Sequence, residues 1–445
     1  MGDTPIGRLL LKLSPPVMLA LLIQSIYNIV DSYFVAQYSL SGLTALSIIF
    51  PIQLLMTALG TGTGTGLNIL ISRMDGNGDT ARQRDVVKSG LYLGIWNFLI
   101  FTCIGMLLIG SYYTISSNQA EVRAEGIQYA QIIFLGSFGL FMESNCTKLL
   151  QAKGNMVTPM LAQVAGAAIN LVFDPIFIFG LFGAPELGVA GAAIATIMGQ
   201  WAAMLITLKA VFRTYDVRGT FRFKDCIQIY QGGFPSIIMQ SLYTLYIVGL
   251  NLILKQFTED AVTVLGIYYK LQTFFFIPLM GLQQVIVPVI SFNYGAHDNK
   301  RVNDTLRYSI LISCGVMALG TFIFMAFPKE LILIFAGSTP VLNIGTPALR
   351  IISVSFLPAS LAMMFTVYFQ GIEKGKCSVF ITVLRQIILL VPLAWLFHFA
   401  GLSYVWLTFP VTEVIAMCCG FFLYRKGKRM VSVKTAENCL VYANV

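Results

Sequence analysis

The chain has 445 residues, of which 57% are apolar and only 11% are charged, and its formal net charge is +9. A soluble domain has roughly a quarter of its residues charged, so a chain with this composition cannot cover a water-exposed surface. The excess of Lys and Arg does not indicate a nucleic-acid partner, because these residues gather in particular loops, as described below. The composition therefore excludes an ordinary soluble protein and predicts one that is embedded in a lipid bilayer.

Twelve apolar segments are long enough to cross a bilayer, which requires about 20 residues in a helix. Their length and continuity favour helices, because the strands of a membrane barrel are shorter and alternate in polarity. We predict an all-α polytopic membrane protein with spans at about 14–36, 44–72, 86–110, 125–150, 157–182, 187–212, 233–255, 262–290, 305–327, 347–371, 378–400 and 402–424.

The distribution of basic residues predicts the topology of these spans. If the N-terminus is cytoplasmic, 23 of the 29 Lys and Arg residues fall in the inner loops and the two tails, and only four fall in outer segments. Cytoplasmic loops carry such an excess of Lys and Arg. We therefore expect a multi-pass protein of the plasma (inner) membrane with both termini in the cytoplasm.

The two halves of the chain repeat each other at a shift of 219 residues. The matching pairs extend over more than a hundred positions and include Pro16 and Pro235, Tyr27 and Tyr246, Gly62 and Gly281, Gly76 and Gly295, Asp79 and Asp298, and Gln151 and Gln370. Six spans per half make the repeat parallel, with a pseudo-two-fold axis along the membrane normal, as in many secondary transporters. The expected division is an N-lobe (1–212), a cytoplasmic linker (213–232), a C-lobe (233–424) and a basic cytoplasmic tail (425–445).

Acidic residues inside the apolar segments are the first candidates for function, because a charge in the bilayer is costly unless it faces a polar interior. Asp31 and Asp174 each lie 17 residues from the start of their spans, which begin at 14 and 157. At a rise of 1.5 Å per residue they lie at the same depth. Glu143 belongs to a span that enters from outside, and we expect it to serve a different step.

Two acids that share a cavity are suited to carrying a coupling ion. Burial and a like-charged neighbour favour the protonated form of a carboxyl group, so the pair can take up a proton. With Asn170 and the hydroxyl of Thr196, the same acids offer oxygen ligands to Na⁺. Pro175 removes a backbone donor beside Asp174 and is expected to loosen that helix. The alternative is an acid paired with a structural donor.

The C-terminal half carries milder polar groups in its spans. These include Gln240 and Tyr243 in the seventh segment, and Lys270 in the eighth, which could serve as a counter-ion. Arg385 and Glu413 are expected to pair with each other or to extend toward the membrane surface.

No enzymatic site is evident in the sequence. The run from Thr61 to Gly66 (TGTGTG) lies within a span and has no Walker lysine, so we expect it to allow close helix packing. We find no combination of nucleophile and base and no metal-binding spacing. The sequence therefore predicts neither an enzyme nor a cofactor.

Several motifs resemble the multidrug and toxic compound extrusion (MATE) family, and its MepA-like bacterial branch in particular. They are QSIYNIVD at 24–31, FPIQ at 50–53, QAKG at 151–154, NLVFDP at 170–175, GVAGAA at 188–193, GFP at 233–235 and NYG at 293–295. The resemblance implies two six-helix lobes and an N-lobe ion site at Asp31, Asn170 and Asp174, with Thr196 as the nearest match to its hydroxyl ligand. A second acidic site present in some branches is missing, because Met239 and Gln240 stand at the corresponding positions.

The resemblance implies a monomeric multidrug efflux antiporter, which exports lipophilic organic cations in exchange for H⁺ or Na⁺. The cavity residues expected to contact substrate are Gln24, Tyr27, Asn28, Phe50, Gln240, Tyr243 and Lys270. One alternative is a lipid-linked oligosaccharide flippase of the related superfamily, in which Lys270 and Arg385 would meet a lipid phosphate. A membrane-embedded enzyme and a passive channel are further alternatives, each with less support in the sequence.

Overall fold

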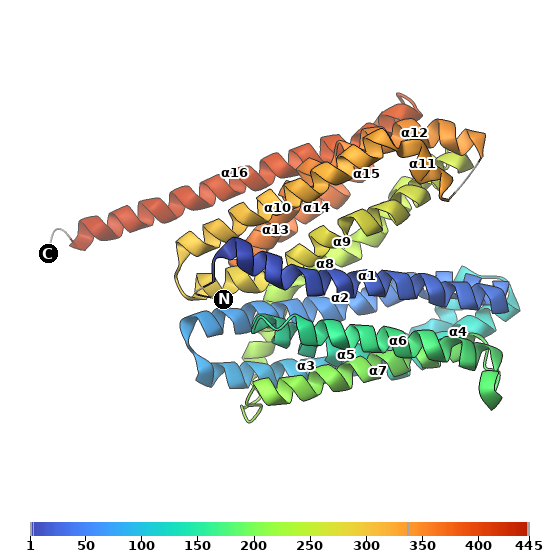
Figure 1. Ribbon diagram of the computed structural model, residues 1–445, viewed down its shortest axis with the longest axis horizontal. Coiled ribbons are helices and arrows are strands. Elements are labelled where there is room, and N and C mark those ends of the chain that lie inside the picture. Colours follow the sequence, from blue (N-terminus) through green and yellow to red (C-terminus); the bar gives the residue numbers. More distant parts are fainter. Residues whose placement is uncertain (1, 3, 336–337, 443–445) are drawn as a thin grey trace. The chain divides into compact units, whose positions relative to one another are not determined.

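The computed structural model describes residues 2, 4–335 and 338–442, and the part described is almost entirely helical and contains no strand (Figure 1). The elements are α1 (Ile6–Tyr38), α2 (Leu40–Asn77), α3 (Thr80–Ser116), α4 (Ala120–Gly136), α5 (Phe138–Ala152), α6 (Val157–Phe179), η1 (Leu181–Gly183), α7 (Val189–Thr214), α8 (Phe223–Leu254), α9 (Glu259–Gly295), α10 (Asn299–Ala326), α11 (Pro328–Leu333), α12 (Thr339–Ser353), α13 (Phe356–Gly371), α14 (Gly375–Val383), η2 (Leu384–Leu389), α15 (Leu390–His398) and α16 (Leu402–Tyr442).

The helices follow the predicted spans. Ten helices of the described chain are long and apolar enough to cross a membrane, or eleven if α12 and α13, which meet at an angle of 47°, form one span. The predicted span 125–150 consists of two shorter helices, α4 and α5, which join at Ser137. The prediction of an all-α polytopic membrane protein is confirmed.

The duplication is visible in the backbone as well as in the sequence. The break between α4 and α5 at Ser137 recurs between α12 and α13 at Val354 and Ser355, within two residues of the 219 shift. Left-handed φ angles also recur in pairs, at Gly78 (72°) and His297 (58°), and at Gly154 (79°) and Glu373 (59°).

Equivalent aspartates cap the helices that follow the first of these turns. Asp79 accepts a hydrogen bond from the backbone N–H of Arg82 at the start of α3, and Asp298 accepts one from Arg301 at the start of α10. A side-chain oxygen at this position satisfies an N–H that has no partner within the helix. Residues at matching positions in the two halves therefore form the same local structure.

By the density of their internal contacts the residues form two compact units. The first unit comprises Met1–Ser241 and Met280–Thr305, and the second comprises Leu242–Leu279 and Leu306–Val445, so α8, α9 and α10 are each divided. Within the first unit α1 contacts α2 and α6, α7 contacts α5 and α6, and α2 contacts α3, α4 and α5. Two apolar cores form there, and one of them includes Tyr113, Phe134 and Phe141.

Glycines allow close helix contacts within the first unit, and these contacts obey the repeat. A Cβ at Gly62 would lie 2.2 Å from Cγ1 of Ile237, and a Cβ at Gly281 would lie 2.6 Å from Cγ of Met18. Positions 62 and 281 differ by 219, and so do positions 18 and 237. The two contacts are therefore equivalent under the repeat, with the glycine in the first half in one contact and in the second half in the other. The structure thus confirms that the TGTGTG run serves close packing.

The segment before α8 is fixed to the start of α3. Asp85 accepts hydrogen bonds from the backbone N–H and the hydroxyl of Thr220, at 2.7 Å and 3.2 Å, and pairs with Arg222 at 3.0 Å. Helix α8 itself begins at Phe223, inside the expected linker. This linker segment is therefore docked against α3 within the first unit.

Candidate functional site

Asp31 and Asp174 lie side by side in the first unit. Asp31 comes from α1, Asn170 and Asp174 from α6, and Thr196 from α7. The carboxyl groups of Asp31 and Asp174 lie within hydrogen-bonding reach of each other. The Nδ2 group of Asn170 donates to Oδ1 of Asp174 at 3.1 Å and to Oγ1 of Thr196 at 3.3 Å. Four residues from three helices therefore form one polar cluster.

The cluster contains more hydrogen-bond acceptors than donors. Asp174 is fully buried and Asn170 is 3% exposed. Oδ1 of Asp31, Oδ1 of Asn170 and Oδ2 of Asp174 are buried, and the described residues provide no hydrogen-bond partner for them. A hydrogen bond between two carboxyl groups requires a proton on one of them.

Among the described residues, no basic side chain lies within electrostatic range of the carboxyl groups of Asp31 and Asp174. Burying carboxylates without a counter-charge is costly, so the cluster must gain positive charge from outside. A proton satisfies this requirement, and so does a cation that takes these oxygens as ligands.

Two tyrosines and a glutamine lie around the acids. Tyr27 of α1 and Tyr129 of α4 both lie within electrostatic range of Asp31 and Asp174. Nε2 of Gln53 donates to the hydroxyl of Tyr129 at 3.2 Å. Sequence reasoning missed Tyr129 because its segment carries no motif, whereas Gln53 ends the FPIQ motif.

Glu143 lies near this cluster but has partners of its own. It accepts a hydrogen bond from Oγ1 of Thr147 at 2.6 Å, and it is within electrostatic range of Tyr27. Lys148, which follows Thr147, donates from Nζ to the Oε1 atoms of Gln151 and Gln284, both at 2.9 Å. Glu143 is thus separate from the pair formed by Asp31 and Asp174.

The residues expected to contact substrate occupy both units. In the first unit Gln24 is half-buried, Asn28 and Phe50 are exposed, and Gln240 donates to Oγ1 of Thr61 at 2.8 Å. In the second unit the ring of Tyr243 lies 5.3 Å from that of Tyr246. The Nζ of Lys270 lies 5.6 Å above the ring of Phe335.

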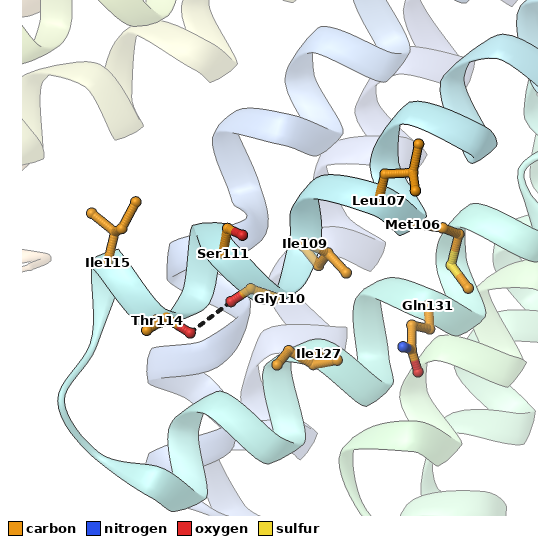
Figure 2. A pocket seen from close by; sticks show the side chains of 9 residues that line it. All are labelled: Met106, Leu107, Ile109, Gly110, Ser111, Thr114, Ile115, Ile127 and Gln131. Carbon is orange, nitrogen blue, oxygen red and sulfur yellow. Dashed lines mark hydrogen bonds between the residues drawn. The ribbon is translucent and has the colours of Figure 1, made fainter.

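A cavity of about 580 Å³ lies away from the acids, between α3 and α4 (Figure 2). Apolar side chains make up most of its lining, including Ile109 and Ile127, and Gln131 also lines it. Leu107 and Ile115 at its edge are 80% and 87% exposed. Because it opens on an apolar surface of membrane-spanning helices, we interpret it as a lipid-facing groove.

The sequence model of the MatE family matches residues 16–176 and 235–396. The two matches begin 219 positions apart, which is the shift of the internal repeat. The chain belongs to the MatE family. Members of this family are transporters, and the chain is accordingly a multi-span membrane transporter and not an enzyme.

Relatives within the family match the chain over nearly its full length. The multidrug export protein MepA of Staphylococcus aureus (strain MRSA252) is 24% identical over 443 residues, which cover 98% of this chain and 97% of the relative. The FAD transporter of Shewanella oneidensis is 22% identical over 450 residues and 98% of each chain. A solved outward-facing multidrug resistance MATE transporter superimposes with a TM-score of 0.89 at 24% identity, covering 97% of both chains.

Proposed function

We propose that this transporter is a multidrug efflux antiporter, which exports lipophilic organic cations in exchange for H⁺ or Na⁺ by alternating access. The names of its relatives support export of drugs. The observation that carries the coupling is the buried pair of Asp31 and Asp174, with no basic partner among the described residues. Such a pair alternates between a loaded and an unloaded state only by exchanging a cation with solution.

The coupling ion would bind at the oxygens that lack partners. A proton would be shared between the carboxyl groups of Asp31 and Asp174. A Na⁺ ion would take Oδ1 of Asp31, Oδ2 of Asp174 and Oδ1 of Asn170 as ligands, with the hydroxyl of Thr196 beside them. Glu143 would act at a separate step near Tyr27.

Antiport requires that ion and substrate stabilise different states of the protein. An ion at Asp31 would change the packing of α1 and lower the affinity for substrate. The aromatic and polar residues predicted from the sequence to meet substrate would contact a flat organic cation through stacking and cation–π interactions. These groups are Gln24, Tyr27, Asn28, Phe50, Gln240 and Tyr243, with Lys270 as a further lining residue.

The proposed unit of transport is a monomer in the plasma (inner) membrane with both termini in the cytoplasm. Its lobes would be residues 1–212 and 233–424, joined by the linker 213–232 and followed by the basic tail 425–445. The 23 basic residues in the proposed inner segments support this orientation.

Transport of ethidium by proteoliposomes tests the proposal, with a pH gradient and a Na⁺ gradient imposed separately. We expect one gradient to drive transport, and both Asp31→Asn and Asp174→Asn to abolish it. A Thr114→Ser variant, altered in the groove between α3 and α4, serves as the matched control and should retain transport. Lipid-linked oligosaccharide translocation without ethidium transport would replace the proposal with a flippase function.

A further inference from the structure

The second repeat contains a buried ionic cluster on the helices that correspond to those of the acid pair. By the 219 shift, α8 and α9 correspond to α1 and α2, the helix formed by α14, η2 and α15 corresponds to α6, and α16 corresponds to α7. Tyr246 and Gln272 of this cluster are the counterparts of Tyr27 and Gln53. Both repeats therefore bury ionisable groups between equivalent helices.

The cluster of the second repeat contains its own positive charge. Nε of Arg385 donates to Oε1 of Glu413 at 2.6 Å, which confirms that the two residues pair. Glu413 is only 8% exposed. Arg385 lies in η2, a six-residue π-helix. Such widened turns are rare and often mark functional sites.

A small cavity of about 30 Å³ adjoins the pair, and Gln272, Gln386 and Tyr268 are among its lining residues. Oε2 of Glu413 and Oε1 of Gln386 are buried without a partner among the described residues. The volume is that of one water molecule, which could donate to both oxygens. The cavity has no room for an organic substrate.

The two clusters differ in the source of their positive charge. In the first repeat two acids face each other without a base, whereas in the second repeat Arg385 neutralises Glu413. Building on the function proposed above, we infer that Arg385 is a tethered cation, which supplies in the second repeat the positive charge that the first repeat takes from its coupling ion. Ion coupling is then confined to the first repeat.

The pairing with Arg385 determines the charge state of Glu413. The charged or titratable groups that face it are Arg385 of η2, Tyr246 of α8 and Tyr268 of α9. Only Arg385 among them is a cation at neutral pH. Glu413 is therefore ionised in the native protein, and it must take up a proton when Arg385 is replaced by a neutral residue, because a buried carboxylate without a counter-charge is costly.

An apolar carbodiimide such as dicyclohexylcarbodiimide tests this, because it modifies protonated carboxyl groups in apolar surroundings, and peptide mass spectrometry locates the label. In the native protein we expect Glu413 to stay unlabelled at pH 7 to 8. In Arg385→Gln we expect label at Glu413, and in Arg385→Lys, which keeps a cation, we expect none. The Arg385→Gln/Glu413→Gln double variant controls for label elsewhere in the same peptide.

Label on native Glu413 would overturn the inference, and this measurement needs no variant that folds poorly. Absence of label in a monodisperse Arg385→Gln protein would also overturn it. The experiment does not require transport, so it separates this inference from the proposed function. In Na⁺-free buffer, absence of label on Asp31 and Asp174, together with the expected result at Glu413, would count against the coupling site of the first repeat and leave the role of Arg385 standing.

Discussion

Gly66 offers the sharpest test of the contact between α2 and α8. A Cβ at this position would lie 1.9 Å from the backbone oxygen of Ile229 and 2.6 Å from the backbone nitrogen of Gly233. Because both are backbone atoms, no side-chain rotation can relieve the overlap. In Gly66→Ala the two helices must separate by about 1.1 Å, the difference between 1.9 Å and the 3.0 Å below which real Cβ contacts essentially do not occur.

Overpacking of this kind costs about 1–3 kcal/mol. If the cost falls on the state in which the two helices touch, the equilibrium shifts by about 5- to 150-fold toward a state in which they are apart. Cys226 on α8 reports this shift, because its side chain is 4% exposed and packs in the same apolar cluster as Leu67 and Ile229. We expect its rate of maleimide labelling, followed by peptide mass spectrometry, to rise by a similar factor.

Gly110→Ala is the matched control, because Gly110 also lies within a membrane-spanning helix and has no atom within 4 Å of its Cβ position. Its Cys226 should react at the native rate. Equal labelling rates at Cys226 in Gly66→Ala and Gly110→Ala would contradict the predicted separation of α2 and α8.

Three further changes test local structure. In Asp85→Asn the linker loses the charge that holds Thr220 and its neighbours, and limited trypsin digestion should cut it faster than in the native protein; an unchanged rate would mean that the linker is held elsewhere. Gly78→Ala should lower the free energy of unfolding by about 1–2 kcal/mol, because φ is positive there, whereas His297→Gly at the equivalent turn should not lower it; equal losses in thermal melts would contradict this. Tyr113→Phe removes a buried hydroxyl that donates a hydrogen bond and should cost about 1 kcal/mol, measured in the same melts.

Length and apolar content were enough to predict the spans, because the bilayer requires helices and requires them to be long. The repeat was predictable from identical residues at a shift of 219. The matching depth of Asp31 and Asp174 was also predictable, since depth follows from residue count. Their direct contact was not, because depth does not determine the direction in which each helix turns its side chains.

Features that depend on packing could not be predicted from the sequence. The break at Ser137 has no proline, and nothing in the sequence marks the π-helix that contains Arg385. Tyr129 reaches the acid pair from a helix whose sequence shows no motif. Each of these features depends on how neighbouring helices pack. The pattern of apolar residues within one segment does not reveal that packing.

The assignment of ion coupling to Asp31 and Asp174 is tested most directly by the affinity for ethidium, measured by equilibrium binding to purified protein as pH and Na⁺ are varied separately. We expect one of the two ions to weaken binding, and we expect Asp174→Asn to remove this dependence while substrate still binds. Equal dependence on the ion in the native protein and in Asp174→Asn would contradict the assignment of the coupling ion to the pair formed by Asp31 and Asp174.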